Sequence, residues 1–493
     1  MTRNVVVCCL DTVRQDYFAR FAPRLRERAD VTAPGCRAAS GWSVPSHASM
    51  VTGDLPHEHG VHTYEPGLDA LDVADTVFGD LSEHASIGVS ANVYAGSAFG
   101  FDALFDRFVD VSRDHRFDRG LDVSSFVDDH PEPGVGRYLD VARAALAHDR
   151  PGRSLANAAC LAAGQAIETG PLDGLPTPFD DGAATISRAF TRLVDDTSEP
   201  FVGFCNFMEA HEPHRDTLGY DSQLYDVPRG WRSSVDPQAV ATAGRADDGD
   251  GDGGDGREGD GDRSGDEALE TALERYRSTY GASIEYLDRK LVDFVDAVQA
   301  ATDRETTVVV TADHGENLGT PADEGALGHV TSLSEGVLNV PFLVIDPPGS
   351  YPSTVTDPVS HCDLRRLVRA FAREKSPSIS SAEPVVAEVA GPTPGNETLV
   401  EAEPDRWDRA LRAAYDGERK VVWDDDGDAT GYEISSDRPC WQRRVPGDAE
   451  RPPAAACRFE VPLDEFRDRA TADADETDLD AGVEERLRDL GYR

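Results

Sequence analysis

Five short apolar runs, each followed by polar or charged residues, constrain the fold of this chain most strongly. They span residues 4–11, 85–92, 201–211, 306–316 and 340–347. Continuous apolar runs of this kind are typical of strands buried on both faces, as in parallel sheets. A helical periodicity between them, clearest over residues 267–300, provides the crossovers that parallel strands require. The pattern predicts an α/β fold, an α/β/α sandwich with a mostly parallel central sheet.

Polar side chains stand where four of these runs end. They are Asp11, Asn92, His211, Asp313 and His314. In an open α/β sheet, ligands bind beyond the carboxyl ends of the strands. We therefore expect these five residues to share one site.

Two carboxylates and an imidazole in this set indicate a divalent cation. Asp11 alone is better explained as a helix cap. Asp313 and His314 repeat the arrangement after a second buried run, and Gly315 permits a tight turn there. Oxygen and nitrogen ligands suit Ca²⁺, Mg²⁺, Mn²⁺ and Zn²⁺, so the metal is not resolved. The prediction is one divalent metal ion held by Asp11, Asp313 and His314.

The stretch "SGWSVPSHASMVTG", residues 40–53, predicts a nucleophile at the start of a helix. Ser43 comes just before Pro45, the helix is expected to begin near Ser46, and Gly53 would close it. The N–H groups and the dipole at a helix N-terminus favour an anion. A metal beside the Ser43 hydroxyl would lower its pKa and activate it. The alternative is an ordinary Ser/Thr-capped helix.

Three further histidines are candidates for proton transfer or substrate binding. His211 and His214 lie in "FMEAHEPH", where Pro213 favours a loop over the helix of a zinc protease motif. His329 precedes a segment that leads into the run at 340–347. An imidazole can protonate a leaving group or bind an oxyanion, although each His taken singly is better explained as structural. We take His211 and His329 as candidate catalytic residues.

With these motifs together, the chain resembles the sulfatase family of the alkaline phosphatase superfamily over nearly its whole length. The resemblance rests on "LDTVRQD" (10–16), "SVPSHASMVTG" (43–53), "TGDLPHEHGV" (52–61), "MEAHEPH" (208–214), "TADHGENLG" (311–319), "GHVTSLSEGVLNVPFLV" (328–344), "VSHCDL" (359–364) and the closing "LRDLGY". It implies a sheet between helix layers, a smaller C-terminal sheet subdomain and metal-assisted hydrolysis of sulfate or phosphate esters. It also implies metal ligation by Asp11, Asp313 and His314, with Ser43 as the nucleophile.

The same resemblance assigns further roles. His211 falls where sulfatases keep an active-site His, and His329 where many keep a Lys. Asn92 is the nearest polar substitute for a Lys-x-His that many arylsulfatases have, and Thr12 stands where a second metal-binding Asp is usual. The candidate substrate-binding residues are His47, Asn92 and His214.

One departure from the family pattern concerns the nucleophile. Sulfatases convert the first residue of Cys/Ser-x-Pro-x-Arg to formylglycine, and here the fifth position of that motif is His47. Formylglycine at Ser43 is therefore one possibility, and an unmodified Ser suits phosphoryl transfer better. The expected function is metal-dependent hydrolysis of sulfate esters. The alternatives are a phosphodiesterase or phosphonate monoester hydrolase with unmodified Ser43, and a non-catalytic binding protein with the same fold.

The charge of the chain limits its partners. Acidic residues number 92 and basic residues 48, for a net charge of −44, and Lys occurs only at positions 290, 375 and 420. An acidic, Lys-poor surface predicts a halophilic cell, where salt screens the self-repulsion. The same charge repels polyanions, so we expect a small-molecule sulfate or phosphate ester substrate, no nucleic acid and no membrane partner. The sequence does not indicate an oligomeric state.

The cysteines and the N-terminus predict a cytoplasmic protein. Eight Cys occur singly or as one adjacent pair, without metal-ligand spacing, and are expected to be buried thiols. The apolar run from Val5 to Leu10 is too short for a signal peptide or a membrane span.

The length of 493 residues predicts more than one unit. We expect a catalytic domain over residues 1–375 and an α+β subdomain over 376–493. In the subdomain, residues 405–434 predict a helix and then a hairpin that turns at "DDDGD" (424–428), and 483–493 predict a terminal helix.

A Gly/Asp-rich segment at about residues 244–267 is expected to be a disordered acidic insertion, because it cannot bury enough apolar surface to fold. A calcium-binding repeat is the alternative, which the irregular Asp spacing does not favour. This insertion and residues 110–200 are the segments expected to contact the organic part of the substrate.

Overall fold

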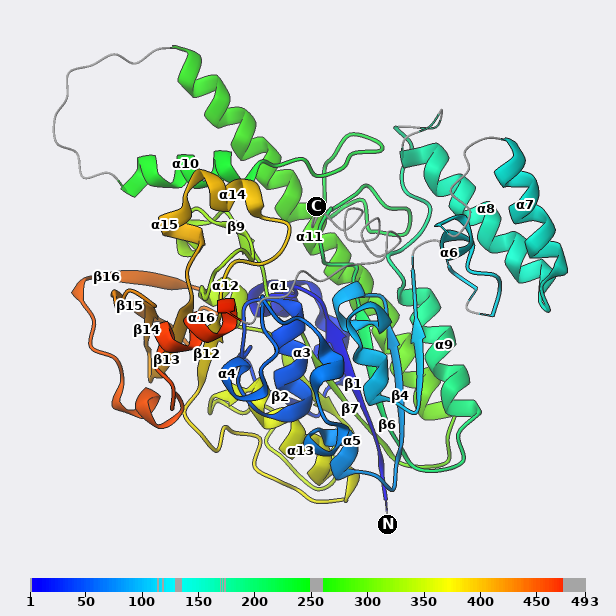
Figure 1. Cartoon of the computed structure of the whole chain (residues 1–493), viewed down its shortest axis with the longest axis horizontal. Helices are drawn as coiled ribbons and strands as arrows, with labels where there is room; N and C mark the ends of the chain where they lie inside the picture. The colour runs from blue at the N-terminus through cyan, green and yellow to red at the C-terminus, as the bar shows by residue number, and fades with distance from the viewer. Residues whose placement is uncertain are drawn as a thin grey trace.

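The computed structural model describes residues 2–112, 115–117, 119–128, 135–168, 170, 172, 174–248 and 260–472. Its centre is a seven-stranded sheet with the order β2-β10-β7-β1-β6-β4-β5 (Figure 1). The strands are β1 (Asn4–Leu10), β2 (Val31–Thr32), β4 (Ala85–Ser90), β5 (Arg107–Asp110), β6 (Phe201–Phe207), β7 (Thr306–Thr311) and β10 (Phe342–Ile345). All five apolar runs that predict strands therefore form them.

The strand directions confirm a mostly parallel sheet, with one difference. Strands β7, β1, β6, β4 and β5 are parallel to one another, and Cys9 of β1 pairs with Asn206 on one side and Thr311 on the other. Strand β10 is antiparallel to both β7 and β2. The expectation that the run at 340–347 joins the parallel strands is wrong. An apolar run indicates that a strand is buried on both faces but does not indicate the direction of the strand.

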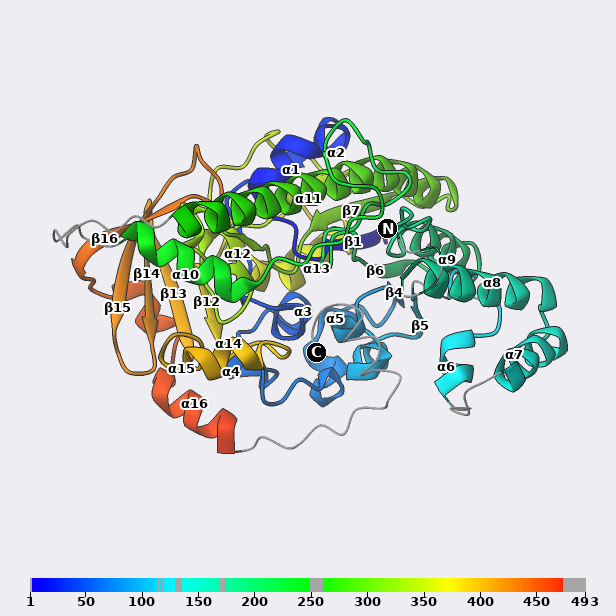
Figure 2. The same cartoon turned by 90° about the horizontal axis from the view of Figure 1, so that it is seen from above.

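Helices cover both faces of the sheet, as Figure 2 shows. One layer contains α1 (Gln15–Phe21), α2 (Pro23–Arg28), α9 (Ala183–Asp195) and the long α11 (Asp260–Ala300). The other contains α3 (Ser43–Thr52), α5 (Val77–Asp80) and α13 (Leu364–Ala372). The predicted helix over 267–300 is therefore confirmed as part of α11, and the sandwich has the expected three layers.

Helix α3 begins earlier than predicted. It starts at Ser43 and not near Ser46, with extended Trp42 as its N-cap. Pro45 fits in the first turn, because the N–H groups there have no partner within the helix. The helix ends at Gly53, whose φ of 82° favours glycine and whose N–H donates to the Ser49 carbonyl at 2.9 Å.

The C-terminal part is a five-stranded antiparallel sheet with the order β12-β13-β14-β15-β16. Its strands are β12 (Val386–Val389), β13 (Leu411–Asp416), β14 (Arg419–Asp424), β15 (Ala429–Ile434) and β16 (Gln442–Asp448), and α16 (Leu463–Ala472) packs on it through Leu463 and Phe466. The predicted hairpin at 424–428 is confirmed between β14 and β15.

The helix predicted before that hairpin is wrong beyond its first turn. Only α15 (Pro404–Trp407) is helical there, and the chain then enters β13, whose first four residues are all buried. Burial between α16 and the catalytic domain overrides the helical propensity of this Ala- and Arg-rich stretch. The predicted terminal helix at 483–493 lies outside the described residues.

Three helices project from one end of the sheet: α6 (Val123–Asp128), α7 (Val135–Ala147) and α8 (Pro151–Glu168) (Figure 1). The other helices are α4 (Pro56–His59), α10 (Pro237–Asp248), α12 (Glu335–Leu338) and α14 (Glu397–Ala402), and the short strands are β3 (Cys36–Arg37), β8 (Asn317–Leu318), β9 (Leu327–Gly328) and β11 (Val359–Ser360). Helices α10 and α11 extend into both ends of the predicted Gly/Asp insertion. Its middle, residues 249–259, lies outside the described residues.

All eight cysteines are free thiols, as predicted, but not all are buried. Five are buried, Cys160 and Cys362 are half-buried, and Cys457 is exposed. Over the part of the chain that the structure describes, no helix has both the length and the apolar character needed to span a bilayer.

Candidate active site

The register of the central sheet brings two predicted ligands together. Because Cys9 pairs with Thr311, the residues two places further on, Asp11 and Asp313, leave adjacent parallel strands side by side. One ligand atom each from Asp11, Asp313 and His314 can be chosen so that all lie within 4.8 Å of one another, and all three residues are fully buried. This geometry matches the predicted three-residue metal site.

The unused oxygen atoms of the two carboxylates favour a cation there. Asp11 Oδ1 and Asp313 Oδ2 are buried and accept no hydrogen bond. A buried carboxylate oxygen without a partner is costly. Burial and the neighbouring Asp313 raise the pKa of Asp11 well above its ordinary value. A divalent ion between the two carboxylates would give both oxygen atoms a partner and would offset the repulsion between the carboxylates. These residues therefore fit the expected metal.

The ring of His314 is oriented as a ligand. Its Nδ1 lies 2.8 Å from the Gly315 carbonyl oxygen, which can only accept a hydrogen bond, so Nδ1 carries the proton. The Nε2 lone pair of the neutral ring then faces Asp313 Oδ2 at 3.5 Å. A carbonyl that fixes the second ring nitrogen is the usual support for a metal-binding His.

Ser43, the predicted nucleophile, lies at the edge of this group. Its Oγ is 3.4 Å from His314 Nε2 and accepts a hydrogen bond from Asn92 Nδ2 at 3.2 Å. The same Asn92 amide donates to Asp11 Oδ2. Asn92 follows β4 and therefore joins the nucleophile to a metal ligand. The hydroxyl and the three ligands thus form one buried cluster.

His47 lies behind the nucleophile, one helical turn along α3. Its Nδ1–H donates to the Ser43 carbonyl at 2.7 Å, and its Nε2 accepts from Asn206 Nδ2 at 2.8 Å. The ring is fully buried, and burial lowers its pKa. Both nitrogens are thus occupied by protein groups, an arrangement that holds the first turn of α3 in place.

Asn206, the residue that holds His47, was not predicted from the sequence. It is fully buried in the middle of the sheet, on β6. A signal existed, because Asn is the one strongly polar side chain in the apolar run "FVGFCNF". A buried polar residue in such a run needs a partner, which here is the imidazole of His47.

His329 and His211 form a row of rings that extends from His314. The ring centroids of His314 and His329 are 4.4 Å apart, and those of His329 and His211 are 5.8 Å apart. His329 Nδ1 lies 3.2 Å from Glu316 Oε1, and His211 Nδ1 donates to the Glu212 carbonyl at 2.6 Å. Burial lowers the pKa of His329 to about 4 and that of His211 to about 3, so both rings are neutral near pH 7.

His214 lies beside two tyrosines of α11. Its ring makes edge contacts with Tyr276 and Tyr280, at centroid distances of 4.5 and 5.6 Å. Its Nε2 is buried without a hydrogen-bond partner. None of its described contacts is with Ser43 or with the three ligands, so its predicted substrate-binding role stays a prediction.

Thr12 takes a different part from the carboxylate that the family pattern places there. Its backbone has a φ of 59°, and its N–H donates to Asp313 Oδ1 at 3.2 Å. Its hydroxyl donates to the Ala210 carbonyl at 3.0 Å. Thr12 therefore orients a ligand through its backbone and ties the loops after β1, β6 and β7 together.

The loop that carries Asp313 and His314 is fastened to α12. Gly315 N–H donates to the Val337 carbonyl at 2.7 Å, and Glu316 N–H donates to the Gly336 carbonyl at 3.0 Å. A Cβ on Gly315 would come within 2.1 Å of the Gly336 oxygen, so only glycine permits this approach.

The C-terminal sheet in turn holds α12. The Glu335 carboxylate contacts Arg37 at 2.8 Å, the Tyr415 hydroxyl at 2.7 Å and Lys420 Nζ at 3.2 Å. Lys420 also donates to the Leu333 carbonyl at 2.9 Å. Tyr415 and Lys420 come from strands β13 and β14 and Arg37 from β3, and none of the three was predicted from the sequence.

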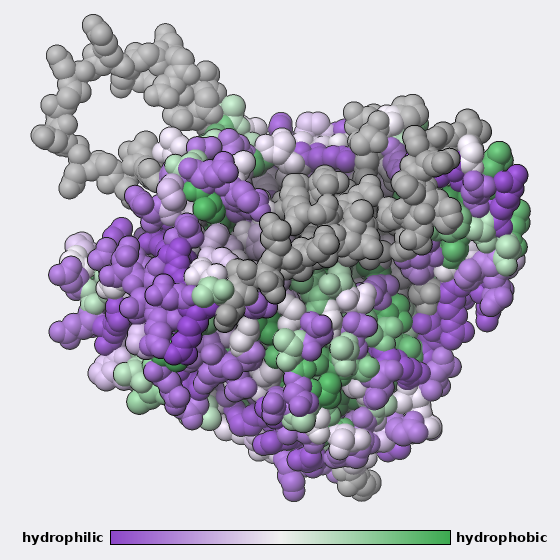
Figure 3. All heavy atoms as spheres, viewed as in Figure 1, coloured by the Kyte–Doolittle hydropathy of each residue, from purple (hydrophilic) through white to green (hydrophobic). Residues whose placement is uncertain are grey.

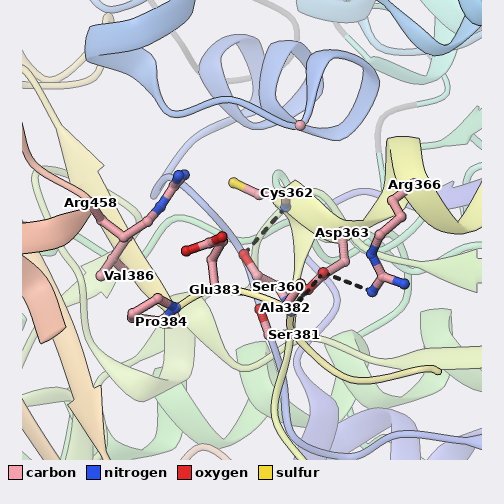
Figure 4. A pocket seen from close by; sticks show the side chains of 11 residues that line it. Ser360, Cys362, Asp363, Arg366, Ser381, Ala382, Glu383, Pro384, Val386 and Arg458 are labelled. Carbon is pink, nitrogen blue, oxygen red and sulfur yellow. Dashed lines mark hydrogen bonds and ion pairs between the residues drawn. The ribbon is translucent and has the colours of Figure 1, made fainter.

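A pocket of about 170 Å³ lies elsewhere, at the far end of α3 (Figure 4). It is lined by Gly53, Ser360, Cys362, Asp363, Arg366, residues 381–384, Val386 and Arg458. Arg366 donates to Asp363 at 2.9 Å within it. The pocket contains none of the predicted site residues, and its basic groups stand beside acidic ones.

Comparison with known proteins agrees with this geometry. Residues 3–366 match the sequence model of the sulfatase family. No protein with a curated description is similar enough in sequence to be matched.

Solved structures share the fold. A phosphonate monoester hydrolase from Silicibacter pomeroyi has 15% identity and a TM-score of 0.55, covering 98% of this chain and 96% of its own. A protein solved with its substrate D-glucosamine-2-N,6-O-disulfate has 12% identity and a TM-score of 0.55, covering 98% and 100%. A 2-O GAG sulfatase has 14% identity and a TM-score of 0.54, covering 96% and 93%.

Proposed function

Because the chain belongs to the sulfatase family, we propose that it is a metal-dependent hydrolase of sulfate esters in which Ser43 provides the nucleophile. The observation that carries the proposal is the position of Ser43 Oγ, 3.4 Å from His314 Nε2 at the edge of the group formed by Asp11, Asp313 and His314. A hydroxyl beside three potential metal ligands at the start of a helix has the surroundings of an activated nucleophile.

In the first step, Ser43 Oγ loses its proton and bonds to the sulfur atom, the bond between sulfur and the ester oxygen breaks, and the ester oxygen takes up the proton and leaves as an alcohol. When bound, a divalent ion would neutralise charge on the non-bridging oxygens and lower the pKa of the Ser43 hydroxyl. Asn92 would position the hydroxyl through its hydrogen bond at 3.2 Å. In the second step, water releases sulfate and restores the Ser43 hydroxyl.

We propose that the neutral ring of His329 relays the proton released by Ser43 to the leaving oxygen. Glu316 Oε1, 3.2 Å from His329 Nδ1, orients this ring. His211 Nδ1 donates to the Glu212 carbonyl, and the ring lies next to that of His329 at a centroid distance of 5.8 Å. His211 is therefore the alternative to His329 for assisting the leaving oxygen, and His47 and Asn206 position α3.

The charge of the site favours singly charged substrates. Among the described side chains, Ser43 and the three ligands contact Asn92, His47 and His329, and neither Lys nor Arg. Two carboxylates and one divalent ion have no net charge, so a dianionic phosphate monoester would find no compensating cation. A sulfate ester carries a single negative charge, as phosphodiesters and phosphonate monoesters do.

The second candidate function is therefore hydrolysis of phosphonate monoesters or phosphodiesters by unmodified Ser43. The position of His47 favours it, because a neutral, fully occupied imidazole stands where the formylglycine motif has a charged Arg. A formylglycine hydrate can release sulfate by collapsing to the aldehyde, whereas an unmodified Ser leaves a slowly hydrolysed ester.

The test combines mass spectrometry of the Ser43 peptide, from protein purified from its native host, with a substrate panel. A loss of about two mass units would establish formylglycine and support the sulfatase. An unmodified Ser43 with turnover of phosphonate monoesters would support the second candidate. Ser43→Ala should abolish either activity. Absence of turnover for every ester in the panel, with Asp313→Ala leaving the cellular phenotype unchanged, would instead support a binding protein.

A further inference from the structure

The α7–α8 hairpin, residues 135–168, exposes three large apolar side chains within 17 residues of the chain. Eight large hydrophobic residues are exposed over the described part of the chain, and three of them, Leu139, Leu146 and Leu155, lie in this hairpin. Leu146 is 62% exposed and Leu139 54%. Figure 3 shows hydrophobic side chains gathered over α7 and α8 at the edge of the molecule.

These leucines belong to continuous helical stripes. Leu139 and Leu146 are seven residues apart on α7 and share one face. On α8, Leu155 is followed at helical spacing by Ala159 and Ala162, which are also exposed. Small side chains on such a stripe let another helix approach closely.

The hairpin uses a different face to attach to the body. Asn157 Nδ2 donates to the carbonyls of Phe117 and Leu121, and Ser154 Oγ accepts from Leu121 N–H at 2.8 Å. The buried residues Val141 and Ala145 of α7 do not join the main core. The leucine stripes are therefore left over after the hairpin has packed against its own protein.

The charge of the hairpin indicates which partner can cover the leucine stripes. The hairpin has four Arg (137, 143, 150, 153) against three acidic residues (140, 149, 168), in a chain whose net charge is −44. Two copies that met elsewhere would bring acidic surfaces together. Two hairpins can meet without that repulsion.

Size and composition also favour a second copy over a lipid surface. Helices of 13 and 18 residues offer a face of about 500 Å² per copy, or about 1,000 Å² in total, at the lower limit for a specific dimer. An anionic lipid surface would repel a chain whose net charge is −44, and residues 135–168 carry only one more basic than acidic residue to offset this.

We propose that the α7–α8 hairpin is the contact of a symmetric homodimer, in which the leucine stripes of two copies pack into a four-helix arrangement. A two-fold axis lets one surface pair with itself and closes the assembly. The small contact area makes the dimer dependent on protein concentration. Molar salt strengthens it by screening the repulsion between the acidic bodies.

Sedimentation of the full chain in molar KCl over a range of micromolar concentrations tests this. The mass of the wild type should rise from one chain to two, and the double variant Leu146→Asp, Leu155→Asp should weaken association at least tenfold. Val445→Asp is the control, because Val445 is a similarly exposed apolar residue on β16. A wild type that stays monomeric, or a double variant that dimerises normally, overturns the proposal.

Hydrogen exchange of the wild type gives a second readout that does not depend on a folded variant. Peptides from α7 and α8 should become more protected as concentration rises, and unchanged protection in an associating sample overturns the proposal. Binding to vesicles of anionic phospholipid that is lost in the double variant would also overturn it, in favour of a lipid surface.

Discussion

Asn92 gives the proposed nucleophile, Ser43, and the candidate metal ligand Asp11 a common support. Its amide donates both to Ser43 Oγ and to Asp11 Oδ2, so one side chain sets the distance between them. The residue follows β4 directly and caps a short turn by accepting from Tyr94 N–H at 2.8 Å. Its side chain is therefore held at both its oxygen and its nitrogen before any substrate binds.

Asn92→Ala should lower kcat/KM about 100-fold, because one preorganised donor at a reacting oxygen contributes roughly that factor. Steady-state kinetics on the best ester of the panel would measure it. Asn396→Ala, at the start of α14, is the control and should leave kcat/KM unchanged. An Asn92→Ala enzyme with wild-type kinetics and a wild-type melting temperature would contradict the positioning role.

Asp11→Asn should have opposite effects on stability with and without metal. In the metal-free protein it removes a buried carboxylate whose pKa is raised by burial and by Asp313, so the free energy of unfolding should stay equal or increase. In the wild type, metal at 100 times its Kd should add about 2.7 kcal/mol, and the variant should lose most of this gain. Melting curves with a chelator and with Mn²⁺ provide the measurement. An equal gain in both proteins would place the metal elsewhere.

At the scale of elements, the C-terminal sheet acts on the site through α12. Glu335 at the start of α12 meets Arg37, Tyr415 and Lys420, and carbonyls of the same helix receive the N–H groups of Gly315 and Glu316. Burial lowers the pKa of Lys420 even with Glu335 beside it. The loop that carries two ligands is thereby connected to strands about 100 residues further along the chain.

Lys420→Met should destabilise the protein by about 3–5 kcal/mol, since it leaves Glu335 buried with part of its compensation removed. Hydrogen exchange should increase in the loop at 313–318. The activity should fall as well, because this loop carries Asp313 and His314. Lys375→Met is a matched control, because Lys375 is one of only three lysines and is exposed. If exchange in the loop stayed at the wild-type level, the proposed connection would be wrong.

The sequence predicts the elements whose signal is local. Apolar runs identified the five strands, and the polar residues at their ends identified Asp11, Asn92, Asp313 and His314 as neighbours. Nothing in the local sequence indicates that β10 runs antiparallel to its neighbours. The helix expected around Leu411 was wrong because packing decides between helix and strand in that stretch.

The supporting residues were hidden for a related reason. Asn206 and Lys420 contact His47 and Glu335, which are far away along the chain, at 159 and 85 residues. Spacing within one segment cannot report such contacts. A polar residue inside an apolar run marks only that some partner must exist.

The whole molecule should lose stability as the pH falls below about 6.5, because several buried histidines are neutral when folded. His361 is fully buried, and burial lowers its pKa from 6.5 to about 3. As the pH falls through this window, the unfolded chain takes up a proton that the folded chain refuses. Each such His therefore removes up to about 1.4 kcal/mol of stability per pH unit.

His361→Asn should reduce this slope by about one proton between about pH 4 and 6, measured by denaturant unfolding in the presence of a chelator. His148→Asn is the control, because His148 is a partly exposed histidine just after α7 and its replacement removes no buried ring. An unaltered slope in His361→Asn would show that this ring is protonated in the folded state.

The charge of the molecule predicts that folding depends on salt. A net charge of −44 repels itself in dilute buffer, and a Debye length of about 3 Å at 1 M salt removes most of that repulsion. The free energy of unfolding should therefore increase steadily with KCl concentration. Circular dichroism during urea titration at several KCl concentrations tests this, and full cooperative folding in dilute buffer would refute it.

The link between the C-terminal sheet and the metal-ligand loop also bears on how the protein is made. Asp11 is synthesised long before Lys420, which follows it by 409 positions. A nascent chain still on the ribosome would hold the nucleophile and all three ligands long before β13 and β14 can secure α12. The loop at 313–318 would therefore reach its final position only after β13 and β14 have folded.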